Sequence, residues 1–170
     1  CVCDWSSDVC SSDLYPQTPI LKQREDGILD KIAELAPNAT VVANQPAIDT
    51  TEGLNAMETI LQSHPDVKVV CCIGGGGATG ANEALKGFYG SEYPEDIGIF
   101  STDLTDETIA AMQNGEFNKV CVAITGNSYV CGDAAYQLVV DKASGEEMEQ
   151  NVYRDLIPVS IDNLEEMIAY

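Results

Sequence analysis

Apolar positions recur along this chain with two periods, one typical of amphipathic helices and one typical of buried strands. Apolar residues three or four positions apart predict a first helix over residues 25–35, where Ile28, Ile32 and Leu35 share one face. The same spacing predicts further helices over residues 50–64, from near Gly80, from 106 onward, over 133–142 and from 163 onward. A threonine is expected to cap the second of these helices, and Thr105 the fourth.

Between the helical segments lie runs of β-branched and other apolar residues without helical spacing. They predict strands over residues 39–48, 67–73, 97–103, 119–124 and 152–161. The run VKVVCCI is almost continuously apolar, which is typical of a strand that is covered on both faces of a parallel sheet. Strands that alternate with helices in this way predict βαβ units. The expected fold class is therefore α/β, with a parallel sheet and helices on both faces.

The first 14 residues follow neither period. They repeat the unit Ser-Ser-Asp, and the stretch DWSSDVCSSDL resembles the translation of a sequencing-library adapter. We interpret residues 1–14 as an artefact of sequence assembly and exclude them from fold reasoning. The alternative is a metal-binding tail built on Cys1, Cys3 and Cys10, but no histidine or second cysteine pair at zinc spacing accompanies them. On our interpretation the chain is a fragment that lacks its true start.

The formal net charge of −20 argues against a protein that mainly binds nucleic acid, because too few cations are present to neutralise phosphates. Four cysteines follow the excluded segment. Neighbours on a strand point to opposite faces, so Cys71 and Cys72 are expected to be buried thiols and not a chelating pair. A Cys121–Cys131 disulfide is left open for an exported protein. We predict no metal site and no cofactor.

The run CCIGGGGATGAN joins a predicted strand to the predicted helix near Gly80. Gly75, Gly77 and Gly80 spell G-x-G-x-x-G, and Asp103 follows 23 residues later. This pattern is typical of a dinucleotide-binding turn, so an NAD(P)-dependent oxidoreductase is one alternative. However, a run of four glycines contains this spacing easily, and the run follows the second predicted strand. No catalytic constellation is evident, and the single histidine, His64, lies in an expected loop.

Ligands of open parallel sheets bind beyond the carboxyl ends of the strands. Here the segments NQPAID, GGGG, STD and TGNS follow the strands, and none carries a basic residue. Asp103 can accept hydrogen bonds from two adjacent hydroxyls, with a helix or turn cap as the alternative. Arg24 offers a planar fork of five donors, with a solvated surface arginine as the alternative. A neutral polyol suits this edge better than a phosphate does.

Five stretches of the chain resemble one family: REDGI, NQPAIDTTEGLNAMETILQSHPDVKVV, GATGANEAL, STD and IPVSIDNLEEM. They are similar to the C-terminal two thirds of periplasmic sugar-binding proteins of the ribose and galactose group, which serve ATP-binding-cassette (ABC) transporters. The resemblance implies a type I periplasmic-binding-protein fold with two lobes and three hinge crossings. Residues 15–124 would form the C-terminal lobe, 125–158 a hinge crossing and the last segment of the N-terminal lobe, and 159–170 the return.

The resemblance also implies ligand-binding positions. Arg24 and Asp103 match residues that contact the sugar in ribose-binding members. Other positions depart from the family: Ile48 or Asp49 stands where an aromatic ring often stacks on the sugar, Gly74 and Gly75 replace Asn and Asp, and the stretch from Thr125 to Asn127 replaces a glutamine. A ligand other than ribose is therefore expected, and the glycines are expected to leave space for it or to offer backbone N–H groups.

These observations predict a non-catalytic sugar-binding protein that closes its lobes around a monosaccharide or polyol and delivers it to the membrane permease of an ABC importer. The expected location is the periplasm or the outer face of the cell membrane. The effector domain of a sugar-responsive transcription regulator is an alternative with the same fold. An upstream export signal with a lipid-attachment cysteine, in place of a DNA-binding helix pair, would distinguish the two.

Overall fold

The computed structural model describes residues 8–12, 19–124 and 128–168. Within these ranges it contains the strands β1 (Asp8–Ser12), β2 (Thr40–Gln45), β3 (Val69–Cys72), β4 (Gly98–Thr102), β5 (Asn118–Ile124) and β6 (Leu156–Val159). The helices are α1 (Pro19–Leu35), α2 (Thr50–Ser63), α3 (Gly75–Tyr89), α4 (Asp106–Gln113), α5 (Ser128–Ser144) and α6 (Leu164–Ile168). Strands and helices alternate along the chain as the sequence predicts.

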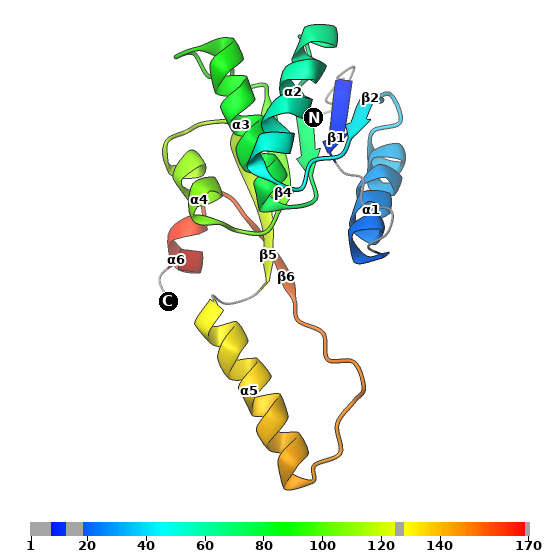
Figure 1. Ribbon diagram of the computed structural model, residues 1–170, viewed down its shortest axis with the longest axis vertical. Coiled ribbons are helices and arrows are strands. Elements are labelled where there is room, and N and C mark those ends of the chain that lie inside the picture. Colours follow the sequence, from blue (N-terminus) through cyan, green and yellow to red (C-terminus); the bar gives the residue numbers. More distant parts are fainter. Residues whose placement is uncertain (1–7, 13–18, 125–127, 169–170) are drawn as a thin grey trace.

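The strands form one sheet in the order β2-β1-β3-β4-β5-β6, flanked by helices (Figure 1). Neighbours from β2 to β5 are parallel, which confirms the α/β class. The last strand differs from the expected all-parallel arrangement, because β6 pairs antiparallel with β5. The chain leaves the sheet after β5, runs out along α5 and comes back in the opposite direction (Figure 1).

One strand comes from the segment that the sequence analysis excluded. Residues Asp8–Ser12 form β1, which pairs with β2 on one side and β3 on the other. An interior strand makes backbone hydrogen bonds to neighbouring strands on both sides. Its place in the sheet therefore depends less on the pattern of apolar side chains than the place of an amphipathic helix does. The fold therefore uses five residues for which the hydropathy pattern predicts no element. The adapter origin of residues 1–14 stays a prediction.

Several element boundaries differ from the predicted ones. The third helix begins at Gly75 and not near Gly80, so the glycine run forms its first turn. The second helix is capped by Asp49, whose carboxylate accepts a hydrogen bond from the Glu52 backbone N–H, and not by a threonine. The predicted cap Thr105 is confirmed. Helix α5 starts at Ser128, five residues before the predicted start, and β6 starts at Leu156, within the segment predicted to belong to the other lobe.

The main hydrophobic core lies between the sheet and the helix pair α2 and α3. It contains Met57, Ile60 and Leu61 of α2, Ala81 and Leu85 of α3, and Val70, Cys72, Ile99 and Phe117 at the sheet. The two helices approach closely because both present glycine: a Cβ added at Gly53 would lie 2.7 Å from the Gly77 carbonyl oxygen. A smaller core joins α4 and α6 to β5 and β6 through Met112, Cys121, Val159 and Leu164.

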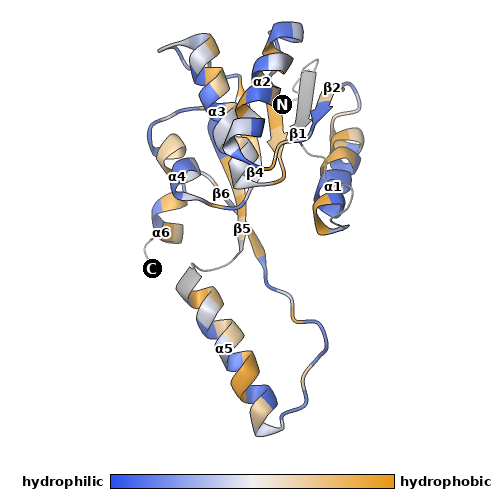
Figure 2. Ribbon diagram, viewed as in Figure 1, coloured by the Kyte–Doolittle hydropathy of each residue, from blue (hydrophilic) through white to orange (hydrophobic). Residues whose placement is uncertain are grey.

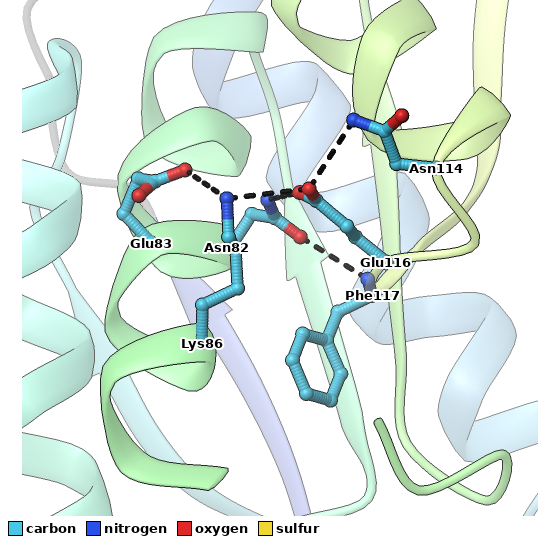
Figure 3. Close-up of polar contacts among 6 residues, drawn as sticks. All are labelled: Asn82, Glu83, Lys86, Asn114, Glu116 and Phe117. Carbon is cyan, nitrogen blue, oxygen red and sulfur yellow. Dashed lines mark hydrogen bonds and ion pairs between the residues drawn. The ribbon is translucent and has the colours of Figure 1, made fainter. Parts of the chain in front are cut away.

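A buried polar cluster fixes α3 to the turn before β5 (Figure 3). The Asn82 side-chain nitrogen donates to Glu116 Oε2 at 2.6 Å, and the Phe117 backbone N–H donates to Asn82 Oδ1 at 3.1 Å. Lys86 Nζ lies 3.2 Å from Glu116 Oε1, which also accepts from Asn114. The buried carboxylate is thus neutralised and hydrogen-bonded, as burial requires. Helix α3 is held at its middle while its N-terminus lies at the strand ends.

Helix α5 differs from the other helices because it projects from the sheet (Figure 1). Figure 2 shows hydrophobic and hydrophilic segments alternating along it, and Tyr136 and Val139 are 69% and 66% exposed. None of the helices in the described part of the chain combines the length and apolar character that crossing a membrane requires.

Among the described residues, Cys71, Cys72, Cys121 and Cys131 form no disulfide, so the pairing left open for Cys121 and Cys131 is absent.

Candidate functional site

A pocket of about 330 Å³ lies beyond the carboxyl ends of β3 and β4. Five of the eight residues predicted to bind ligand line it: Arg24, Ile48, Gly74, Gly75 and Asp103. Leu21, Ala47, Ile73, Gly76 and Thr105 complete the lining. The structure therefore brings Arg24 and Asp103, which are 79 positions apart in the chain, together at the edge of the sheet where α/β proteins bind ligands.

Arg24 reaches the pocket from α1 and is held there by acceptors on two strand ends. Its Nη1 atom donates to the Ile73 carbonyl oxygen at 2.9 Å and to Thr102 Oγ1 at 3.1 Å. The same atom lies 3.5 Å from Asp103 Oδ2. The Arg24 side chain is 35% exposed, so it is not the solvated surface arginine that sequence analysis weighed as the alternative. The guanidinium is fixed on one side and keeps further N–H donors.

Asp103 follows β4 directly and has a φ of 69°, in the left-handed region that non-glycine residues rarely adopt. Its backbone N–H donates to the Val122 carbonyl oxygen at 3.0 Å, which ties this conformation to β5. Its carboxylate is 55% exposed beside Arg24. The N-cap of α4 is Thr105, so Asp103 does not serve as that cap. A strained backbone that presents a charged acceptor to a pocket is typical of binding sites.

The four consecutive glycines have different neighbours. A Cβ added at Gly74 would meet only Asp103 Oδ2, at 3.7 Å, so this position opens toward the pocket. A Cβ at Gly75 would lie 2.5 Å from Thr105 Cγ2, and one at Gly76 would lie 2.3 Å from the Ile48 carbonyl oxygen. Among Gly74, Gly75 and Gly76, the expectation that the run clears space for a ligand therefore fits only Gly74. Gly75 and Gly76 are small because protein atoms lie against them.

The dinucleotide-binding interpretation of this run has a structural alternative. Gly75, Gly77 and Gly80 all lie within α3, and a Cβ at Gly80 would lie 2.2 Å from the Thr50 carbonyl oxygen and 2.5 Å from the Leu54 nitrogen. The last glycine of the pattern thus allows α2 to approach α3. Gly77 and Gly80 lie against α2, and Gly75 lies against Thr105, so close packing explains the glycine spacing without a pyrophosphate.

The remaining residues predicted to bind ligand differ in where they lie. Ile48 lines the pocket and is half exposed, so it offers an apolar surface where an aromatic ring was the family expectation. Asp49 is not in the lining, and its carboxylate caps α2 through the Glu52 N–H at 2.8 Å. Thr125 and Asn127 lie outside the described residues, and their predicted role stays a prediction. Metal-ligating side chains form no cluster of three or more among the described residues.

Two threonines that shape the pocket were not among the predicted ligand-binding residues. Thr102 holds Arg24, and its hydroxyl also donates to the Ile73 carbonyl oxygen. Thr105 caps α4 and places its methyl group against Gly75. Thr102 precedes Asp103 and Thr105 lies two positions after it, so their places near a strand end were a usable signal. Their contacts depend on residues that are distant in sequence.

Comparison with known proteins places the chain in a family. The sequence profile described as periplasmic binding protein domain matches residues 15–147, which is most of the chain. The ABC transporter periplasmic-binding protein YphF of Escherichia coli is 26% identical over 132 residues, 75% of this chain and 39% of that protein. The ribose import binding protein RbsB of Salmonella typhimurium is 32% identical over 100 residues, 58% of this chain and 32% of that protein.

Solved structures agree on the fold. A carbohydrate transporter solute-binding protein from Agrobacterium radiobacter, in complex with D-arabinose, superposes with a TM-score of 0.81 at 24% identity, and the match covers 95% of this chain and 55% of that chain. A Caulobacter myo-inositol-binding protein gives 0.80 at 22% identity, covering 96% and 54%. The chain thus spans about half the length of these structures. It belongs to the periplasmic binding protein domain family.

Proposed function

We propose that this chain comprises the C-terminal lobe and one segment of the N-terminal lobe of a solute-binding protein that binds a monosaccharide or polyol for an ABC importer. The observation that carries the proposal is the placement of Arg24 and Asp103, 3.5 Å apart, in one pocket at the carboxyl ends of β3 and β4. The family match and relatives whose names denote sugar import support it.

The chemistry of the pocket fits a neutral ligand with several hydroxyls. Arg24 supplies N–H donors and Asp103 supplies carboxylate acceptors, so adjacent hydroxyls can both donate and accept. The positive and negative groups offset each other, which favours a ligand without net charge over an anion. Ile48, Leu21 and Ala47 provide apolar surface for the C–H faces of a sugar ring. The open position at Gly74 leaves room for a substituent at that point.

We assign α5 and the segment that leads back to β6 to the second lobe. Helix α5 projects beyond the sheet with exposed apolar side chains, which is unfavourable in water unless another surface covers them. The solved relatives are nearly twice as long as this chain, which leaves room for such a lobe. Under this assignment the chain crosses between lobes after β5 and before β6, and ligand binding closes the lobes by a hinge motion.

The proposed partners are a sugar or polyol and the permease of an ABC transporter, and the proposed location is the periplasm or the outer face of the membrane. Relatives with periplasmic-binding names support this location. The family does not imply catalysis, and we propose no enzymatic role. The regulator alternative is less well supported, because the relatives that match by sequence carry transport names.

Isothermal titration calorimetry tests the proposal. D-Ribose, D-arabinose, D-allose and myo-inositol are titrated into the chain, with NAD⁺ as a comparison ligand. We expect saturable binding of at least one polyol, weaker than in a two-lobed protein because half the contacts are missing, and no binding of NAD⁺. Asp103→Ala should abolish the heat, whereas Glu34→Gln, on the exposed far end of α1, should not change it. NAD⁺ binding without polyol binding would contradict the proposal.

A further inference from the structure

Helix α1 carries Arg24 but is attached to the rest of the lobe in an unusual way. Neither hydrophobic core cluster in the described part of the chain includes a residue of α1. Its single buried residue is a glutamate, Glu25, which is 4% exposed. The predicted apolar face is only partly covered, and Leu35 at its end is 75% exposed. The position of this helix therefore depends on polar contacts more than on apolar burial.

Two adjacent residues of α1 make those polar contacts, and they reach different strands. Arg24 donates to the ends of β3 and β4. Glu25 accepts a hydrogen bond at 2.6 Å from the side-chain nitrogen of Asn44, which lies on β2. In the sheet, β1 separates β2 from β3. The helix is thus held at two points, one on each side of β1.

The Glu25 contact is costly to break. A buried carboxylate needs hydrogen bonds or a counter-charge, and Glu25 has Asn44 at Oε1 and Lys22 Nζ 3.6 Å from Oε2. Glu25 Oε2 and Asn44 Oδ1 have no hydrogen-bond partner among the described residues, so the two side chains rely on the bond that joins them, and Glu25 also on the Lys22 counter-charge. Loss of that bond would leave the buried Glu25 carboxylate with only the 3.6 Å contact to Lys22 and the half-buried Asn44 amide without its acceptor.

We propose that Glu25 is a positioning residue for the ligand site: its hydrogen bond with Asn44 fixes α1 against β2 and thereby holds the Arg24 guanidinium at the ends of β3 and β4. Glu25 does not line the pocket and acts through Arg24. The effect of Glu25 on ligand affinity rests on the proposed function, whereas its effect on the position of Arg24 does not.

The test follows the Arg24 side chain directly by NMR. The chain has two arginines, Arg24 and Arg154, so their guanidinium signals can be assigned by substituting one of them. In the unaltered chain we expect Arg24 Nη protons that are shifted from those of a free arginine and exchange slowly with water. In Glu25→Ala and in Asn44→Ala, these signals should move toward the free position and exchange at least about tenfold faster, the effect of losing a hydrogen bond to a charged group.

Three controls separate positioning from general destabilisation. Glu25→Gln keeps an oxygen that accepts from Asn44, so its Arg24 signals should stay near those of the unaltered chain. Glu34→Gln removes a charge from an exposed ion pair on the same helix and should change nothing. The double variant Glu25→Ala/Asn44→Ala should be no worse than either single variant, because the two residues act through one contact. If one alanine variant fails to fold, the other alanine variant and Glu25→Gln still determine whether Glu25 positions Arg24.

The proposal is overturned if both alanine variants leave the Arg24 signals unchanged, or if Glu25→Gln is as disruptive as Glu25→Ala. Calorimetry with the same four polyols provides the second readout. If one of them binds, Glu25→Ala should weaken it at least about tenfold with no change at Glu34→Gln. If none binds, the proposed function fails, and the Arg24 signals still determine whether Glu25 positions that side chain.

Discussion

Gly76 of α3 lies directly against the backbone of Ile48, the residue that precedes the N-cap of α2. A Cβ added at Gly76 would lie 2.3 Å from the Ile48 carbonyl oxygen and 3.1 Å from the Asp49 Cα. The start of α3 and the segment before α2 are therefore in contact through their backbones. This contact fixes the distance between two segments that line the pocket.

The neighbouring glycines should respond differently to alanine. Gly76→Ala should lower the free energy of unfolding by about 1–3 kcal/mol, because backbone atoms must move to admit the methyl group. Gly74→Ala should lower it by about 0.5–1 kcal/mol, since its Cβ meets a single atom at contact distance and the main cost is that alanine is a poorer N-cap than glycine. Urea denaturation followed by circular dichroism measures both. Equal losses of unfolding free energy in the two variants would show that the contact between Gly76 and the Ile48 backbone does not exclude a methyl group at residue 76.

The backbone conformation of Asp103 should lower the stability of the fold, whereas its carboxylate should contribute to ligand binding. Its φ of 69° costs an L-residue about 1 kcal/mol that glycine does not incur, whereas its ion pair with Arg24 is half exposed and weak. Asp103→Gly should therefore leave thermal stability unchanged or slightly higher while it removes polyol binding. Differential scanning calorimetry and titration calorimetry test the two parts separately. A drop in stability of more than about 1 kcal/mol would mean that the carboxylate has a structural role.

Substitutions in the cluster around Glu116 should have strongly coupled effects on the free energy of unfolding. Asn82→Ala leaves the buried Glu116 carboxylate without its 2.6 Å donor and the Phe117 N–H without an acceptor, so we expect a loss of about 2–4 kcal/mol in unfolding free energy. Glu83→Gln, an exposed residue of the same helix, should cost less than about 0.5 kcal/mol. A double-mutant cycle of Asn82→Ala with Glu116→Ala should show clear non-additivity.

The same cluster predicts a pH dependence. The hydrogen bond with Glu83, and after it the contacts with Glu116, raise the pKa of Lys86 above its usual 10.5. A raised lysine pKa contributes stability that is fully present below the unfolded-state pKa and is lost as pH rises through the folded-state value. Unfolding free energy should therefore decline at alkaline pH, and Lys86→Met should make this decline shallower. An identical decline in the variant would exclude Lys86 as its source.

The buried thiols should react slowly. Burial raises the pKa of Cys71 and of Cys121 to about 11. At pH 8 only about one thousandth of each thiol is then ionised, and the thiolate is the reactive form. Labelling with iodoacetamide, followed by peptide mass spectrometry, should modify Cys131, which is half buried, well before these two. Early modification of Cys121 would show that the core around β5 opens readily.

The parts of the site that could be predicted are those that depend on residue type and position at a strand end. Asp103 was predicted because a two-oxygen acceptor directly follows a strand, and Arg24 because its fork of donors complements that acceptor and matches the family resemblance; both line the pocket. The cap by Thr105 was predicted from local sequence alone. These features need no knowledge of how distant segments pack.

The parts that could not be predicted depend on contacts between distant segments. Glycine has a low helix propensity, so the start of α3 was expected after the glycine run, but the run is helical from Gly75, and its glycines pack against Thr105, Ile48 and Gly53. The role of Gly76 follows from the position of Ile48, which is nearly 30 residues away. Asp49 was expected to bind ligand and caps α2, because the helix begins at Thr50.

An ¹⁵N NMR titration of the chain with D-ribose, D-arabinose, D-allose and myo-inositol tests the proposed ligand site directly. At least one of them should shift the backbone amide signals of Gly74, Gly75 and Asp103 and the guanidinium signals of Arg24 in a saturable way, while signals of the distant Glu83 and Lys86 stay in place. Shifts confined to other parts of the chain, or no saturable shifts at these four residues with any of the polyols, would contradict the proposed site.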